Sequence, residues 1–125
     1  MKSGRWHDQK IRFTANGTAQ KPILLKAQKA GQTRLTGKSR LHIYGIHLVV
    51  DGLFFTEGSV GPNQTVIRLG EDTRHCRLTN TAVIGYSPPD KNTSTAWVHT
   101  LGLHNRIDHC FFSGKSNIGV VLSVN

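Results

Sequence analysis

A repeat of 28 to 29 residues is the feature that most restricts how this chain can fold. Three segments, residues 47–55, 75–83 and 104–112, start 28 and 29 residues apart. Each begins with histidine, has an aliphatic residue at its fourth position and continues with a short polar pair. An apolar stretch and a glycine precede each segment. The unit therefore reads as strand, glycine turn, histidine, strand, polar turn, strand.

Three short strands in a period of this length are what one coil of a parallel β-helix requires. A single coil cannot bury its own inward residues, but coils stacked about 4.8 Å apart pair their backbones and close a core. We therefore predict an all-β parallel β-helix of four to five coils. The alternative, an antiparallel sandwich of hairpins, explains the regular spacing of the histidines less well.

The predicted organisation is a single, partial β-helix domain spanning the whole chain. The coil repeats are expected near residues 41–55, 66–84 and 97–112. Two insertions are expected to project as loops, at residues 57–64 and 85–95. Within the repeat, Gly52 and Asn80 occupy one slot, where a tight bend needs a residue that tolerates the left-handed conformation.

Both ends of the chain read as parts of further coils. Residues 22–27 and 33–37 are expected to form two strands of an incomplete N-terminal coil, and residues 119–125 begin a coil that the chain does not finish. A coil that lacks its neighbour presents an unpaired sheet edge, which invites pairing with another chain. Self-association through these edges is therefore expected.

The charge of +9 over 125 residues predicts an anionic partner. Nucleic acid is ranked last among such partners, because the chain has no nucleic-acid-binding motif and no basic stripe interleaved with aromatic residues. No stretch approaches 18 consecutive apolar residues, so no transmembrane helix and no membrane partner are predicted. The first residues are not followed by the apolar segment of a signal peptide.

Two arginines are the first candidates for contact with an anionic partner. Arg77 and Arg106 hold the same repeat position, and the aliphatic Leu78 and Ile107 beside them are expected to face the core. The arginines would then face outward as a basic stripe that binds carboxylates, bidentately where the geometry allows. The alternative is a solvated face whose charge is balanced by neighbouring acids.

Lys115 and Asn117 are the other two candidate substrate-binding residues. Lys115 is expected to face a substrate groove and Asn117 to brace the turn before Gly119, with a solvent-facing lysine as the alternative. The histidines at positions 47, 75 and 104 are expected to stack on a turn. No metal site is predicted there, because a metal needs several ligands converging in a set geometry.

Five phrases of the sequence occur together in the order that one enzyme family shows. They are Gly17-Thr18 with residues 22–27, residues 35–39, residues 47–53, residues 75–80 and residues 105–119. With these phrases the chain resembles the N-terminal region of polysaccharide lyase family 6, the alginate lyases and chondroitinase B-like enzymes. The resemblance covers nearly the whole chain and implies a right-handed parallel β-helix.

The resemblance implies an anionic uronate polysaccharide as substrate, cleaved by calcium-assisted β-elimination. In the family, calcium neutralises the uronate carboxylate and a lysine acts as base with an arginine nearby. These residues follow the phrase around Lys115, and this chain extends only ten residues beyond Lys115. Glu57 and Glu71 lie apart, so no catalytic residue is assigned, and calcium is implied only for the full-length family.

The resulting functional hypothesis is an N-terminal fragment of a lyase for alginate-like polysaccharide, inactive on its own. The alternative is a non-catalytic carbohydrate-binding or structural β-solenoid. By resemblance, the parent protein would be secreted or periplasmic.

Overall fold

The structure, a computed structural model, describes residues 1–124 and consists of short β-strands joined by turns and loops. No helix long and apolar enough to cross a membrane occurs among these residues. The strands in chain order are β1 (Gly4–His7), β2 (Lys10–Asn16), β3 (Ile23–Lys26), β4 (Thr33–Gly37), β5 (Arg40–Ile46), β6 (Leu48–Asp51), β7 (Leu53–Gly58), β8 (Thr65–Leu69), β9 (Arg77–Thr79), β10 (Ala82–Ile84), β11 (Ala96–Thr100), β12 (Arg106–Asp108), β13 (Phe111–Ser113) and β14 (Leu122–Val124).

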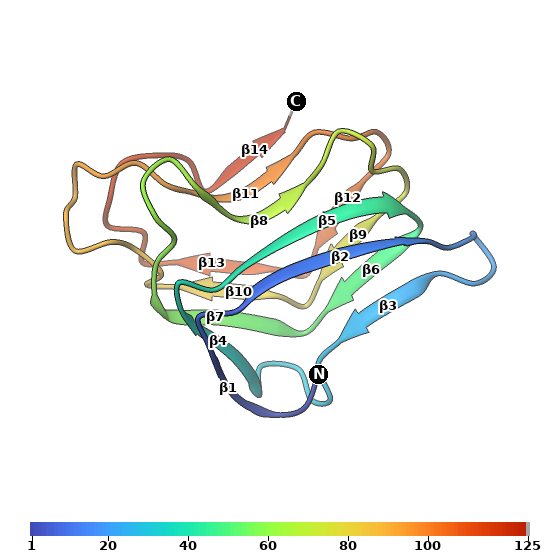
Figure 1. Cartoon of the computed structure of the whole chain (residues 1–125), viewed down its shortest axis with the longest axis horizontal. Helices are drawn as coiled ribbons and strands as arrows, with labels where there is room; N and C mark the ends of the chain where they lie inside the picture. The colour runs from blue at the N-terminus through green and yellow to red at the C-terminus, as the bar shows by residue number, and fades with distance from the viewer. Residues whose placement is uncertain (125) are drawn as a thin grey trace.

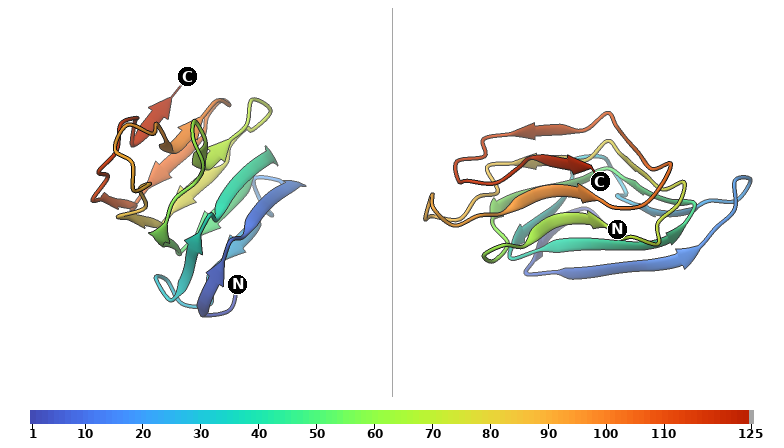
Figure 2. Two further views of the ribbon diagram at one scale, coloured as in Figure 1. Left: turned by 60° about the vertical axis from the view of Figure 1, so that its left-hand side comes forward. Right: turned by 90° about the horizontal axis from the view of Figure 1, so that it is seen from above.

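These strands form three parallel sheets that wrap around one core (Figure 1). We call them sheet A (β1-β4-β7-β10-β13), sheet B (β2-β5-β8-β11-β14) and sheet C (β3-β6-β9-β12). Each coil contributes one strand to each sheet in the order A, B, C, so the described residues make four coils and the first two strands of a fifth. Figure 2 shows successive coils following the same path from blue to red. The parallel β-helix predicted from the repeat is confirmed, and the antiparallel sandwich is wrong.

The first coil begins earlier in the sequence than we expected. Residues 4–7 form β1 and residues 10–16 form β2, which pair in register with β4 and β5. The signal for β2 is its strict alternation, because Ile11, Phe13 and Ala15 are half-buried while the residues between them are exposed. This stretch lies outside the histidine repeat, which is why the repeat alone did not reveal it.

The core is built from columns of inward side chains that continue from coil to coil. In sheet A one column contains Leu35, Phe55 and Val83, all fully buried. In sheet B another contains Leu41, Ile67 and Val98. Because each coil repeats the same inward positions, the core grows by one layer per coil and has no centre of its own.

Two aromatic residues associated with the 85–95 insertion also belong to the core. Tyr86 and Trp97 are completely buried, and the Trp97 indole donates a hydrogen bond of 3.0 Å to the Tyr86 carbonyl. The Tyr86 hydroxyl donates to the carbonyls of Gly37 and Ser39, at 2.9 and 2.7 Å. The insertion of the fourth coil is therefore anchored on the second coil by a buried, hydrogen-bonded tyrosine.

The corners of the coils are occupied by residues in the left-handed conformation. At the corner between sheets B and C, His47, His75 and His104 have φ values of 52°, 54° and 57°. At the corner between sheets C and A, the slot of Gly52 is filled by Asn80 and His109, with φ of 50° and 51°. The left-handed role expected for Gly52 and Asn80 is confirmed, and it extends to the histidines, which with Asn and Asp adopt positive φ more readily than most residues.

The corner histidines also stack on one another, as the sequence predicted. The His47 and His75 rings lie 4.9 Å apart and the His75 and His104 rings 5.2 Å apart, with interplanar angles of 8° and 9°. Stacking follows from the corner geometry, because identical backbone conformations one coil apart direct the rings in the same way.

The middle histidine of this stack provides a test of the corner constraint. We expect His75→Val to lower the free energy of unfolding by about 1–3 kcal/mol, because a β-branched residue is strained at positive φ. His75→Asn removes the ring stack but keeps a residue suited to this conformation, and is expected to cost clearly less. Urea unfolding of the two variants measures the difference, and equal losses would show that ring stacking, not backbone conformation, dominates.

Candidate binding groove

The outward face of sheet B carries a row of basic side chains that crosses the coils in register. Arg12 of β2 lies beside His42 of β5, His42 beside Arg68 of β8, and Arg68 beside His99 of β11. The residues on both sides of Arg68 in β8 are buried, so the strand directs the arginine away from the core. One basic or titratable side chain per coil therefore lines this face.

A second row and an aromatic ring widen the basic surface over the first two coils. Lys10 lies beside Arg40 in the register of β2 and β5. The Arg12 guanidinium lies over the Tyr44 ring, 4.7 Å from its centroid, which fixes it by a cation–π contact. The ring itself covers Gly70, where an added Cβ would approach it to 2.8 Å. Glycine at position 70 therefore leaves the space in which Tyr44, and through it Arg12, is held.

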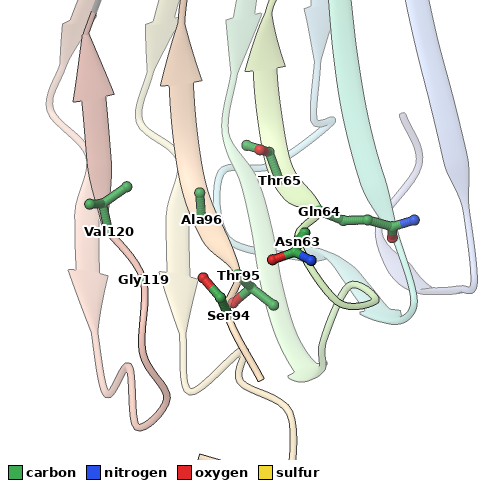
Figure 3. A pocket seen from close by; sticks show the side chains of 8 residues that line it. All are labelled: Asn63, Gln64, Thr65, Ser94, Thr95, Ala96, Gly119 and Val120. Carbon is green, nitrogen blue, oxygen red and sulfur yellow. The ribbon is translucent and has the colours of Figure 1, made fainter. Parts of the chain in front are cut away.

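Three hollows follow this face along the helix axis and share their boundary residues. The first is lined by Lys10, Arg12 and Tyr44 and shares Arg40 and His42 with the second. The second also contains Arg68 and His99, and it shares Asn63, Gln64 and Thr65 with the third. The third hollow continues past Ser94 to Gly119 and Val120, as Figure 3 shows. Together they form one shallow groove, which we call the sheet-B groove.

The groove changes character along its length. Its first half is lined by the basic rows, whereas the second half presents the amides of Asn63 and Gln64 and the hydroxyls of Thr65 and Ser94 (Figure 3). Asn63 and Gln64 come from the 57–64 insertion. The backbone N–H of Asn63 donates a hydrogen bond of 2.7 Å to the Ser94 carbonyl, which ties the insertion to the next coil. The groove therefore offers cations at one end and neutral hydrogen-bonding groups at the other.

His42 lies at the centre of the basic rows. Its burial lowers the pKa of the imidazole, and the positive charges of Arg40, Arg68 and Arg12 lower it further. The ring is therefore neutral at pH 7, which limits the repulsion inside this cluster of cations.

Arg77 and Arg106 are placed as the sequence predicted, but an acid lies between them. They are adjacent in the register of β9 and β12, and their side chains are 41 % and 69 % exposed. Asp108 accepts two hydrogen bonds from Arg77, at 3.0 and 2.8 Å, and pairs with Arg106 at 2.9 Å. The hydrogen bonds from Arg77 lower the pKa of the Asp108 carboxyl to about 2. Asp108 thus balances part of the positive charge of the sheet-C stripe. The sequence had indicated this stripe as the candidate binding surface and had not indicated sheet B.

Lys115 and Asn117 together brace the turn before the last described strand. The Lys115 ammonium donates to the side-chain oxygen of Asn117 at 2.9 Å and to the carbonyls of Asn117 and Ile118. The Asn117 amide donates to the Thr93 carbonyl at 2.7 Å and to the Thr95 hydroxyl at 2.9 Å. The bracing role expected of Asn117 is observed, and Lys115 shares it. Neither residue lines the sheet-B groove.

The residues present do not form a set that fits a calcium ion. Across residues 1–124, no group of three or more His, Cys, Asp or Glu side chains is close enough to hold a metal. Cys76 and Cys110 are free thiols, the first buried and the second half-buried, and burial raises the pKa of both.

The sheet-B groove was not predicted from the sequence, although signals for it were present. Arg68 and His99 hold equivalent positions in two repeats, and Arg12 lies in the alternating stretch of β2. The alignment of Arg12 with His42 could not be read from the repeat, because β2 precedes the first histidine segment.

The position of His42 predicts how pH affects binding in this groove. A bound polyanion opposes the repulsion from the arginines and so favours protonated His42. We therefore expect affinity for an anionic polysaccharide to rise as the pH falls from neutral to about 5, around the ordinary range of histidine. Titration calorimetry at the two pH values measures this, and His42→Gln should reduce the rise. An identical pH dependence in the variant would assign the effect to other groups.

Comparisons with known proteins agree with the fold. A family model described as Chondroitinase B matches residues 1–125. A search of curated proteins found no match. Solved structures match over nearly the whole chain, among them the family 6 alginate lyase AlyGC, with 38 % identity and a TM-score of 0.93 over 98 % of this chain and 17 % of that one.

Two further solved structures give the same result. A family 6 polysaccharide lyase from Pseudopedobacter saltans is 38 % identical, with a TM-score of 0.93 over 100 % of this chain and 28 % of that one. A mannuronic acid specific family 6 lyase from human gut microbiota is 33 % identical, with a TM-score of 0.91 over 98 % of this chain and 30 % of that one. This chain thus spans 17 to 30 % of the length of these enzymes. Its full-length match to the family model and its identity to these lyases show that the chain belongs to polysaccharide lyase family 6, the alginate lyase and chondroitinase B-like enzymes.

Proposed function

We propose that this chain is part of a polysaccharide lyase and that it binds an anionic uronate polysaccharide in the sheet-B groove. The observation that carries the proposal is the row formed by Arg12, His42, Arg68 and His99, one residue per coil. A uronate polymer carries one carboxylate on every sugar. It therefore matches a surface on which the cations Arg12, Arg40 and Arg68 recur from coil to coil better than a ligand with a single charge does. The relatives described as an alginate lyase and as a mannuronic acid specific lyase support this substrate class.

We propose calcium-assisted β-elimination as the reaction of the whole protein. When bound, calcium would neutralise the uronate carboxylate and make the neighbouring proton removable. The described coils contribute substrate binding to this reaction, and we propose that they are inactive alone, since they contain no fitting metal-ligand cluster among residues 1–124. A secreted or periplasmic location, where such polysaccharides are encountered, is part of the same proposal.

The stripe of Arg77 and Arg106 remains a proposed second contact, together with Lys115 and Asn117. Its exposed guanidinium groups can exchange Asp108 for a substrate carboxylate, because one acid serves both arginines. The Lys115 ammonium is committed to carbonyl and amide oxygens in its turn, so we expect it to contribute less.

A binding experiment with paired variants separates the two basic surfaces. We expect Arg40→Ala with Arg68→Ala to weaken binding to alginate at low salt by about tenfold, because two charge contacts from half-buried arginines are lost. Arg77→Ala with Arg106→Ala should weaken it by about threefold or less, because Asp108 already offsets part of their charge. Affinity chromatography on immobilised alginate and calorimetry measure both effects.

The matched control is Arg34→Ala, which removes an exposed strand arginine from β4 in sheet A. Unchanged retention in the Arg40 and Arg68 variant would contradict the proposed groove, and a larger loss in the Arg77 and Arg106 variant would move the site to sheet C. The same samples, supplied with calcium and alginate, should show no rise in the ultraviolet absorbance of unsaturated products. A calcium-dependent rise would show that these coils are active alone.

Self-association through the coil edges is the last part of the proposal. At the C-terminal end of the described helix, Leu122 continues the inward column of Leu41, Ile67 and Val98, yet it is 45 % exposed. Phe111 in the outermost strand of sheet A is 59 % exposed. An apolar coil end with strand edges beside it favours contact with another such surface.

Analytical ultracentrifugation of the chain tests this association. The mean mass is expected to increase with protein concentration, and Leu122→Lys should shift the increase to higher concentration by placing a charge on the exposed end. Arg34→Ala, at an exposed position of the inner strand β4, is the control. A monomer mass at every concentration would contradict association through this edge.

A further inference from the structure

We propose that the polysaccharide lies along the helix axis in the sheet-B groove, with about one sugar on each coil. Its carboxylates lie on the basic rows that contain Arg12, Arg40 and Arg68, and its hydroxyls lie on the neutral half lined by Asn63 and Gln64. This inference rests on the proposed function and adds the direction and register of the bound chain. It assigns Arg12, Arg68 and Asn63 as residues that set this register.

The spacing of the coils is the first argument for an axial direction. Neighbouring strands lie about 4.8 Å apart, so successive members of the row from Arg12 to His99 repeat at this interval. One sugar of an extended pyranose chain advances by a similar distance. A chain along the axis therefore brings a new carboxylate to each coil without a change of conformation in either partner.

In the third and fourth coils, the distribution of charge along a single strand argues against the other direction, whereas β2 and β5 each carry a second basic residue, Lys10 and Arg40. Outward residues of one strand recur every second position, about 6.6 Å apart. In β8, Arg68 is the only charged residue of the strand, and in β11 His99 is the only titratable one. A polymer lying along these strands would meet one such group and then neutral surface, so its remaining carboxylates would be left without cations.

The shape of the groove is the third argument. The individual hollows have volumes of about 170 to 340 Å³, at or below the small end of the range for sites that enclose a compact ligand. They share Arg40 and His42 at one boundary and Asn63 and Gln64 at the other, so they are continuous along the axis. A groove that is continuous but shallow suits an extended polymer that remains partly exposed to solvent.

The neutral half of the groove makes the two ends of the bound polysaccharide meet different groups, cations at one end and amides and hydroxyls at the other. Gln64 accepts a hydrogen bond from the Gly61 amide at 2.9 Å, which holds its side chain at the margin of the groove. Asn63 has a φ of 57°, a conformation that asparagine tolerates and that lets the turn present its side chain beside Ser94. Amides and hydroxyls in this half can bind sugar hydroxyls without requiring a carboxylate.

The direction is tested with a uronate tetrasaccharide that carries a nitroxide spin label at its reducing end. Bound to the isotopically labelled chain, it is expected to broaden amide signals of one terminal coil strongly and those of the following coils progressively less. The graded series should run through β2, β5, β8 and β11, in either order. Broadening confined to one end of the strands, and equal in all four, would show that the sugar lies along the strands and would overturn the axial direction.

The register is tested by chain length and by single variants. Affinity should increase with each added sugar up to about four and then level off, since four coils contribute to the row. Arg12→Ala and Arg68→Ala should each raise the Kd for the tetrasaccharide by about fivefold, the upper range for an exposed ion pair. Arg34→Ala in sheet A is the matched control and should leave it unchanged.

The outcomes distinguish this inference from the function on which it rests. Absence of binding to any uronate oligosaccharide, in a chain whose amide spectrum shows it to be folded, would overturn the proposed function and the inference together. Binding that is already saturated with a disaccharide, or that follows strands instead of coils, would overturn the axial register and leave the proposed function in place.

Discussion

The left-handed corner residues are the constraint on which the rest of the structure depends. Each coil must change direction within one or two residues, and a right-handed residue at those points would carry the chain away from the coil below. His47, His75 and His104 turn one corner and Asn80 and His109 turn another, all with φ near 50°. Because the corners repeat, equivalent residues of successive coils arrive in the same register, and inward and outward positions align over the whole helix.

The alignment of residues between coils places outward charged side chains in rows, just as it places inward apolar side chains in columns. The mechanism that stacks Leu41, Ile67 and Val98 inside sheet B also places Arg12, His42, Arg68 and His99 in one row outside it. In an irregular fold, such residues would be scattered. A β-helix instead converts a basic residue at one repeat position into a linear array with the spacing of its strands, which is the property that links this fold to linear polymers with regularly spaced charges.

Much of the fold was predictable because the sequence repeats it. The spacing of the histidine segments indicated the coil, and the polar pairs around Gly52 and Asn80 indicated a corner. Two parts of the structure, the first coil and the buried Tyr86, were not predicted, for different reasons. The first coil lacks a histidine segment, so β1 and β2 were not recognised. Tyr86 lies in a loop insertion, and its burial depends on carbonyl acceptors at Gly37 and Ser39, nearly fifty residues earlier in the chain.

The sequence alone determined the parallel β-helix, its period, the stacked histidines and the outward position of Arg77 and Arg106, because these follow from local pattern and repetition. Only the tertiary structure decided which basic surface is available. It placed Asp108 between the two arginines, and it aligned residues from four separate strands into the sheet-B groove. The physical reason is that charge balance and groove continuity depend on neighbours in adjacent coils, whose register is set by corners and insertions that a single repeat does not specify.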